Sequence, residues 1–172
     1  MASLFGHGIL AYTITKVVDK RELKILILLA IVSSILPDAD VLAFRFGIPY
    51  EHMLGHRGFT HSIAFAILWS VAISFIFSKT KRFIFFSVLF LATVSHGILD
   101  AMTSGGKGVG FLIPFNDERY FFPFRGIKVS PIGIEKFFSE WGAQVLFSEF
   151  KYVVVPCILV LSVVFLTKKY RK

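Results

Sequence analysis

Histidine and aspartate residues gather in four short stretches of this sequence, and together they could bind a metal ion. Imidazole and carboxylate ligands suit Zn²⁺, with Mn²⁺ or Fe²⁺ as alternatives. A metal-bound water becomes acidic enough to act as a nucleophile near neutral pH, which is the chemistry of metal-dependent hydrolysis. The four stretches are GHGIL, ILPDAD, GHRGFTHS and SHGILD, and their candidate ligands are His7, Asp38, Asp40, His56, His61, His96 and Asp100.

SHGILD ends an apolar segment and places His96 and Asp100 four residues apart. On a helix, this spacing puts both side chains on one face, about one turn apart. An ionised carboxylate at membrane depth needs a partner, because an isolated buried charge is costly. A metal ion would be such a partner. For this pair alone, a His–Asp hydrogen bond that joins two helices is an equally good interpretation.

GHRGFTHS lies between two apolar segments, and its two histidines are five residues apart, a spacing that does not match one helical face. We expect Thr60 to be the N-cap of a helix, so that His56 lies in the preceding loop and His61 in the first turn. Gly55 and Gly58 would let the loop bend back, because glycine adopts backbone conformations that other residues avoid. Both imidazoles could then converge on one site.

Each stretch also has a simpler interpretation. PDAD is typical of a helix end followed by a turn. His7 and His52 could both be structural, and His52 is the weaker ligand candidate of the two. Arg57 could hold an anionic group of a substrate, or it could anchor the chain at lipid headgroups. We favour a metal site because separate stretches rarely supply ligand chemistry together by chance.

The composition indicates a membrane protein. Of the 172 residues, 55% are hydrophobic and 17% are charged, whereas soluble domains contain about 45–50% apolar and about 25% charged residues. The length fits a single domain over residues 1–172. The lone cysteine, Cys157, excludes an intrachain disulfide and a CxxC-type metal site. The first residues lack the features of a signal peptide, so we expect them to belong to the mature protein.

Five apolar segments predict an all-α, polytopic membrane bundle of four to five helices. Three of them lack Asp, Glu, Lys and Arg and approach the roughly 17–25 residues that cross a bilayer. An irregular excursion rich in Gly, Pro and aromatic residues is expected between the last two helices. The three spans are 62–78, 83–99 and 152–167, a marginal one is 25–36, a weaker one is about 7–18, and the excursion is 104–135.

Basic residues form three clusters, and threading five helices through the membrane puts all three on one side. That side holds 11 of the 19 Lys and Arg residues and two of the 11 acids, so the positive-inside rule makes it cytoplasmic, with the C-terminus. All five histidines and ILPDAD then lie at the outer face of a cell (inner) membrane. Because orientation explains these short clusters, nucleic-acid binding is not expected. The clusters are Lys16, Lys20, Arg21 and Lys24; Lys79, Lys81 and Arg82; and Lys168, Lys169, Arg171 and Lys172.

The order of these motifs resembles the YdjM-like family, whose members are identified from sequence as membrane-bound, metal-dependent hydrolases, some of them under LexA control in the SOS response. The resemblance covers most of the chain, since GHGIL, ILPDAD, GHRGFTHS, VSHGILDAMTSGG, RYFFPFRG and GIEKFF occur in this order. The family is similar, more distantly, to the all-α zinc-dependent phospholipase C group, which binds two or three zinc ions through His and Asp.

The resemblance implies zinc ligands in this chain. One or two ions are expected rather than three, because the later helices contain few histidines. Glu135, which follows the aromatic excursion, is a further and less direct candidate. The ligands that the resemblance implies are His7, Asp38 or Asp40, His56, His61, His96 and Asp100.

The sequence therefore predicts an enzyme that hydrolyses an ester or phosphoester in an amphiphilic, phosphorylated or lipid-like substrate of the membrane. Asp38 or Asp40 would bridge metals or orient the nucleophilic water as a general base. Arg57, with Lys107 or Arg125, would contact phosphate oxygens. Two alternatives stay open: a metal-binding or ion-translocating membrane protein without hydrolysis, and a stress-induced structural protein that the site stiffens.

Overall fold

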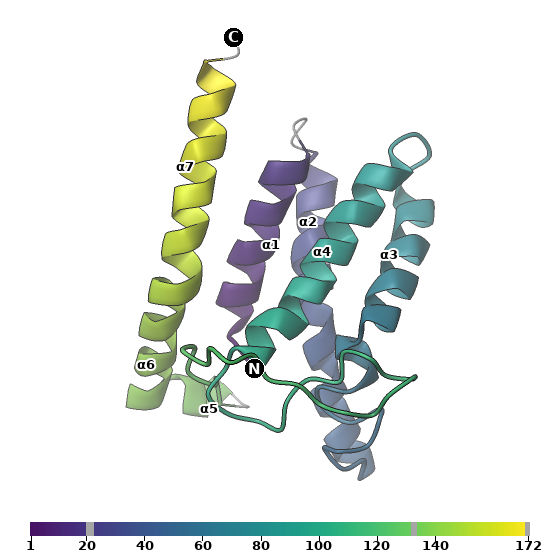
Figure 1. Ribbon diagram of the computed structural model, residues 1–172, viewed down its shortest axis with the longest axis vertical. Coiled ribbons are helices and arrows are strands. Elements are labelled where there is room, and N and C mark those ends of the chain that lie inside the picture. Colours follow the sequence, from purple (N-terminus) through teal and green to yellow (C-terminus); the bar gives the residue numbers. More distant parts are fainter. Residues whose placement is uncertain (20–22, 132–133, 171–172) are drawn as a thin grey trace.

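A bundle of helices carries an irregular segment across one of its ends (Figure 1). The computed structural model describes residues 1–19, 23–131 and 134–170, without the side chains of residues 134 and 135. The described elements are α1 (Leu4–Val18), α2 (Lys24–Ile35), the 3₁₀ helix η1 (Leu36–Phe46), the 3₁₀ turn η2 (Phe59–His61), α3 (Ile63–Phe77), α4 (Arg82–Ala101), α5 (Ile134–Phe137), α6 (Glu140–Glu149), the π-helical turn η3 (Phe150–Val154) and α7 (Val155–Lys169).

The predicted all-α membrane bundle is confirmed. Three continuous helical stretches are long and apolar enough to cross a membrane, and α1 and α3 are shorter apolar helices. The described residues form no strand, and the excursion contains only two isolated β-bridges, Thr103 with Ile127 and Val109 with Tyr120. The three long stretches are Lys24–Phe46, Arg82–Ala101 and Glu140–Lys169.

Helix α2 does not stop before the acidic motif, as the sequence pattern suggested, but continues as a 3₁₀ helix through it. Pro37 lies at the start of this 3₁₀ helix, and proline lacks the N–H that an α-helix would use there. A long 3₁₀ stretch inside a helical span is unusual and often marks a functional position. The change turns Asp38 and Asp40 into the bundle, where both side chains are buried.

Helices α1, α2 and α4 pack around a core of small and branched side chains, and α3 packs on the outer side of α4. Ala11, Ala30 and Ala92 are fully buried there, and small residues let membrane helices approach closely. Helix α7 stands beside α1, away from the other helices (Figure 1). The core side chains are Ala11, Leu26, Ala30, Phe85, Val88, Leu89 and Ala92.

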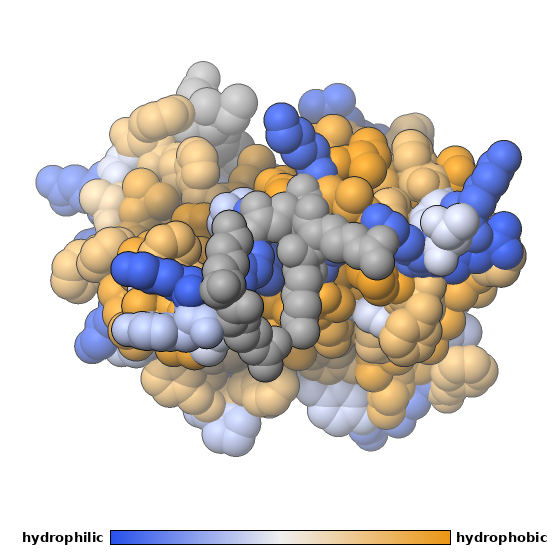
Figure 2. Space-filling view, turned by 90° about the horizontal axis from the view of Figure 1, so that it is seen from above, coloured by the Kyte–Doolittle hydropathy of each residue, from blue (hydrophilic) through white to orange (hydrophobic). Residues whose placement is uncertain are grey.

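The outer surface of the helices is apolar, as a lipid-facing surface must be. Phe83 is 81% exposed, and Ile76 and Phe147 are each 71% exposed. The helix ends that carry the three basic clusters lie together at the end of the bundle opposite the irregular segment (Figure 1). Figure 2 looks onto that end and shows hydrophilic residues around a largely hydrophobic surface. Lys20, Arg21, Arg171 and Lys172 lie outside the described residues.

Candidate metal centre

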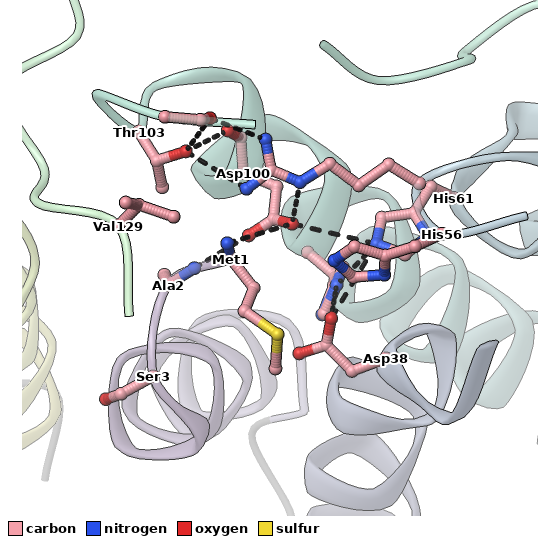
Figure 3. Close-up of polar contacts among 12 residues, drawn as sticks. Met1, Ala2, Ser3, Asp38, His56, His61, Asp100, Thr103 and Val129 are labelled. Atoms are coloured by element: carbon pink, nitrogen blue, oxygen red, sulfur yellow. Dashed lines mark hydrogen bonds and ion pairs between the residues drawn. The ribbon is translucent and has the colours of Figure 1, made fainter. Parts of the chain in front are cut away.

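Seven predicted ligand side chains meet at the end of the bundle that the irregular segment covers, and all are buried. Figure 3 shows Asp38, His56, His61 and Asp100 pointing toward one another from η1, the loop, η2 and α4. His52, the weakest candidate in the sequence, is exposed and accepts a hydrogen bond from the backbone of Leu54 instead. The buried set is His7, Asp38, Asp40, His56, His61, His96 and Asp100.

Asp38, His61, His96 and Asp100 each present one ligand atom, and these four atoms lie within 4.8 Å of one another. His96 Nε2 lies 3.0 Å from His61 Nε2 and 3.4 Å from Asp38 Oδ1. His61 Nε2 lies 3.7 Å from Asp100 Oδ2. With metal–ligand bonds of about 2.0–2.2 Å, two ligands of one zinc ion lie at most about 4.4 Å apart. The separations of 3.0, 3.4 and 3.7 Å meet this limit, and a pair at 4.8 Å would have to close slightly around a shared ion.

The hydrogen bonds of the two central histidines fix which ring nitrogen faces the group. His96 Nδ1 lies 2.7 Å from the carbonyl oxygen of Ser34, which only accepts, so this nitrogen carries the proton. His61 Nδ1 lies 3.2 Å from Asp40 Oδ2 and donates to it. Metal-binding histidines commonly donate their other N–H to a carboxylate or a backbone carbonyl in this way. Both Nε2 atoms then face each other and need a cation, either a proton or a metal ion.

Several buried polar atoms in the group lack a hydrogen-bond partner among the described residues. Both carboxylate oxygens of Asp38 and both ring nitrogens of His7 are unpaired, and Asp100 Oδ2 has only ionic partners. The ring of His7 stacks on that of His96 at 3.9 Å, and its Nε2 lies 3.6 Å from Asp100 Oδ1. A buried carboxylate without a donor is costly, and a bound cation removes that cost. The residues present therefore fit a metal ion.

A second ligand-type group contains Asp40, His56 and His61, but its carboxylate is already saturated. Asp40 accepts from His56 Nδ1 at 2.6 Å, from Thr60 Oγ1 at 2.7 Å and from the backbone N–H of Arg57 at 3.0 Å, besides His61. Four donors on one carboxylate hold the loop in place. The structure thus separates the two acids that the sequence left as alternatives: Asp40 organises the loop and Asp38 faces the ligand group.

The two carboxylates near His61 control its protonation. Burial alone would lower the pKa of His61, but the negative charges of Asp100 and Asp40 outweigh burial and raise the pKa to about 9. Without a metal ion, the ring therefore carries a proton at neutral pH, which supplies the cation that the facing Nε2 atoms require. A metal ion and this proton compete for the same place.

The GHRGFTHS loop bends back on itself, as the glycines predicted. A Cβ atom at Gly55 would lie 2.2 Å from the carbonyl oxygen of Pro49, and one at Gly58 would lie 2.2 Å from that of Met53. Arg57 adopts the left-handed conformation, with φ of 63°. The loop thereby brings the His56 and His61 rings to a centroid separation of 5.7 Å.

The predicted N-cap of the third helix is wrong by two residues. Ser62, not Thr60, caps α3, and its side chain accepts from the backbone N–H of Phe65 at 3.1 Å. Thr60 instead donates to Asp40. His61 therefore lies in η2, ahead of the helix, because the Thr60 hydroxyl is bonded to Asp40 and does not cap the helix.

Arg57 is fully buried, so the interpretation as a headgroup anchor is wrong. Its Nε lies 2.9 Å from Asp100 Oδ2, and its terminal nitrogens donate to the Gly105 carbonyl at 3.0 Å and to Thr103 Oγ1 at 3.1 Å. A Cβ at Gly106 would lie 2.5 Å from the guanidinium, so the glycine-rich turn packs directly on it. Arg57 thus orients and neutralises Asp100.

The other two basic candidates lie in the irregular segment. Lys107 is paired with Glu51, and its side chain is 58% exposed. Arg125 Nε donates to the Thr103 carbonyl at 3.0 Å, and its guanidinium lies 3.8 Å from the centre of the Phe121 ring. These contacts direct both side chains to partners outside the ligand group, so their role toward phosphate stays a prediction.

Two further side chains support the site and were missed at the level of sequence. Arg119 donates to the carbonyls of His56 at 2.9 Å and Tyr50 at 3.0 Å, which holds the ligand loop against the irregular segment. Glu149 is 2% exposed and accepts from the backbone N–H and the hydroxyl of Ser3. The available signal for Glu149 was an acid that precedes the charge-free run 152–167 by only three residues.

The acidic candidate of the last part of the chain, Glu135, lies in α5, and its side chain is outside the described residues. Glu149 has a described link to the site instead. The residue before its partner Ser3 is Ala2, whose backbone N–H donates to Asp100 Oδ1 at 2.7 Å. The segment before α1 is therefore held between the carboxylates of α4 and α6, and Figure 3 shows its contact with Asp100 of α4.

An apolar cavity of about 650 Å³ adjoins the ligand group. Side chains from the start of α1, the end of α2, η1 and the region around α5 form its walls, and Asp38 is the one acidic side chain among the described lining residues. Asp38 therefore belongs both to the ligand group and to the cavity lining, with its two carboxylate oxygens buried directly behind the wall. The lining residues are Met1, Ser3, Leu4, Phe5, Val32, Ile35, Leu36, Asp38, Ala39, Val41, Ser130, Pro131, Phe137 and Phe138.

Comparisons with known proteins identify the family. Residues 1–172 match the YdjM inner membrane protein family. The chain is also 40% identical over 154 residues to the inner membrane protein YbcI of Escherichia coli (strain K12), a match that covers 86% of this chain and 85% of that protein. No solved structure is significantly similar. The chain thus belongs to the YdjM family of inner membrane proteins.

Proposed function

We propose that this protein is a metal-dependent hydrolase that cleaves an ester or phosphoester in an amphiphilic membrane substrate. The observation that carries the proposal is the position of Asp38. Its carboxylate has no hydrogen-bond donor among the described residues and lies near the Nε2 atoms of His61 and His96, and the residue lines an apolar cavity. Zn²⁺ bound there would acidify a water molecule and polarise the substrate oxygen. A catalytic site of this kind suits a substrate with one polar and one apolar part.

Each residue of the group has a role in this proposal. His61, His96 and Asp100 would hold the ion, and Asp38 would complete the ligand set or accept the proton of the attacking water. Asp40 keeps His61 Nε2 directed at the group, as outer partners of metal ligands do. Arg57 keeps Asp100 in place and acts through it, because no face of Arg57 is exposed.

The second ligand-type group gives a two-ion site as a variant of the same proposal. His61 belongs to both groups, with Nε2 facing Asp38 and Nδ1 facing Asp40. Asp40 has the donors that a second ion would replace. We therefore propose one ion at Asp38, His61, His96 and Asp100, and a second only if Asp40 releases its hydrogen bonds.

Metal analysis and a substrate screen on detergent-purified protein test the proposal. We expect at least one Zn²⁺ per chain and turnover of generic phosphodiester, phospholipid or lipid-linked phosphate substrates. His96→Ala should lose both, whereas His52→Ala, which changes an exposed imidazole outside the group, should retain both. Protein that binds metal normally but turns over no substrate would instead favour a non-enzymatic metal-binding role.

A further inference from the structure

The apolar cavity differs from an ordinary lipid-facing groove in one respect. Its wall contains Asp38, which is 6% exposed and has two carboxylate oxygens without a hydrogen-bond partner among the described residues. A groove that only accommodates bulk lipid tails has no need of a buried carboxylate in its wall, because an unpaired carboxylate disfavours hydrocarbon. The cavity therefore joins an apolar compartment to a site of polar chemistry.

The cavity has the size and the lining of a ligand site. Its volume of about 650 Å³ falls within the roughly 300–1,000 Å³ of typical ligand sites. The walls are aliphatic and aromatic. Leu4, Ile35 and Leu36 line the cavity, and the ring centroids of Phe5 and Phe137 lie 6.3 Å apart. Among the described lining residues no side chain is cationic, and the N-terminal ammonium group of Met1 lies 3.9 Å from Asp100 Oδ2, so the walls suit a hydrocarbon chain.

The rim of the cavity faces the apolar exterior of the bundle. Val32 is 45% exposed on α2, Phe5 is 63% exposed on α1 and Phe138 is 82% exposed after α5. Because these side chains belong to the surface that faces lipid, a hydrocarbon chain can enter from the bilayer without crossing water. Its polar end would then lie at Asp38, next to His96 Nε2.

We infer that this cavity binds one hydrocarbon chain of a membrane amphiphile and directs the attached ester or phosphoester to the Asp38 carboxylate. The inference deepens the proposed hydrolase activity and rests on it for the chemistry, but binding of the chain itself requires neither a metal ion nor turnover. Ala39, an exposed small residue on the cavity wall, controls how much of the chain fits.

Photo-crosslinking with the full-length protein in vesicles tests the inference. The probe is a phospholipid with a diazirine at the end of one acyl chain, present as a trace in phosphatidylethanolamine–phosphatidylglycerol vesicles. Peptide mapping should find crosslinks at cavity residues such as Leu4 and Ile35, in excess over those at Val163, which is 60% exposed on α7 outside the cavity. A polyprenyl phosphate with the same diazirine shows whether acyl or isoprenoid chains are preferred.

Ala39→Trp fills the cavity, and Ala72→Trp, on the exposed face of α3, adds the same indole outside it. We expect cavity crosslinks to fall about tenfold in Ala39→Trp. An indole that displaces two methylenes of the bound chain already weakens its binding by about that factor. Ala72→Trp should leave them unchanged. Equal crosslinking of cavity and α7 residues, or cavity crosslinks that are insensitive to Ala39→Trp, would overturn the inference.

The failure of this inference and that of the proposed function are distinguishable. Crosslinks in the cavity that persist in His96→Ala and after chelation of metal, without turnover on any substrate, would support the chain site while removing the hydrolase. Turnover of a lipid substrate that Ala39→Trp leaves unchanged would support the hydrolase while removing the chain site.

Discussion

Two aspartates that are two residues apart in the sequence have opposite environments, and this difference separates a ligand from a scaffold residue. Asp40 accepts four hydrogen bonds and belongs to the folded loop. Asp38 accepts none among the described residues, and its Oδ1 has only the longer contacts to His96 Nε2 at 3.4 Å and His61 Nε2 at 3.9 Å. Asp40 should therefore determine the stability of the metal-free protein, and Asp38 should determine the metal affinity.

Asp40→Asn and Asp38→Asn should have unequal effects on the stability of the metal-free protein. Asp40→Asn leaves buried donors without their acceptor, so we expect a loss of about 1–3 kcal/mol in stability. Asp38→Asn breaks no hydrogen bond and weakens only the longer contacts to His61 and His96, so we expect a smaller loss of stability together with a loss of Zn²⁺ affinity. Thermal unfolding with and without chelator, together with zinc titration, measures both. Equal destabilisation by the two variants would contradict the assignment.

Arg57 and Asp100 form a buried ion pair whose members should be strongly coupled. Arg57→Met leaves Asp100 buried without its cation, so we expect a loss of about 3–5 kcal/mol. Arg57→Met combined with Asp100→Asn should lose less than Arg57→Met alone, because no charge is then stranded. A double-mutant cycle on thermal or denaturant unfolding gives the coupling, and additive effects would show that the pair is not a unit.

At the scale of elements, the site depends on two backbone departures from regular helix: the 3₁₀ continuation of α2 and the bent loop before α3. The first turns Asp38 toward α4, and the second brings His61 over the end of α4. Neither departure completes the ligand group by itself. Together they explain why ligands from segments distant in the sequence meet at one point.

Gly58→Ala should loosen the ligand loop. Its Cβ would lie 2.2 Å from the Met53 carbonyl, so the backbone must shift and His61 with it. We expect weaker zinc binding by about tenfold, which corresponds to a modest loss of about 1.4 kcal/mol. Gly8→Ala is the matched control, because its Cβ meets only an ordinary contact of 3.7 Å with Ile31 and alanine favours helix. Unchanged zinc affinity in Gly58→Ala would argue that the loop does not position the ligands.

At the scale of the whole molecule, metal binding should stabilise the bundle, because one ion would join α4, η1 and η2. A ligand at about 100 times its dissociation constant adds about 2.7 kcal/mol to stability. We expect the unfolding temperature in detergent to fall after chelation and to recover with Zn²⁺. The same experiment on Asp38→Asn should show a smaller shift, and an equal shift would place the stabilising ion elsewhere.

The bundle has one end with the basic clusters and one with the site, and charge predicts which end is cytoplasmic (Figure 1). We expect a reporter fused after Lys172 to be active in the cytoplasm. Lys79→Cys and Lys107→Cys, at opposite ends, should react with a membrane-impermeant maleimide from the inside and the outside, respectively. The buried Cys157 gives no competing signal. Labelling of both from one side would contradict the orientation.

Much of this protein follows from local sequence patterns. Apolar runs free of charge require helices in a membrane, since every backbone polar group must be paired there. His96 and Asp100 share a face because they are four residues apart on α4, and the paired glycines permit the loop to bend. Helix spans, the helical placement of His96 and Asp100 and the common end of the basic clusters could therefore be predicted.

Tertiary structure alone decided which of these residues is free to act. Asp40 finds its donors 16 to 21 residues away in the chain, and Arg57 finds its acceptors 46 and 48 residues away. The spacing of residues along a helix relates positions only within a few turns, so it carries no information on contacts between residues that far apart in the chain. The sequence by itself determined the ligand chemistry and the apolar spans, whereas the folded contacts determined that Asp38 faces the cavity, that Arg57 is buried and that Glu149 holds the start of α1. The reason is that hydrogen-bond saturation depends on neighbours in space, not on neighbours in sequence.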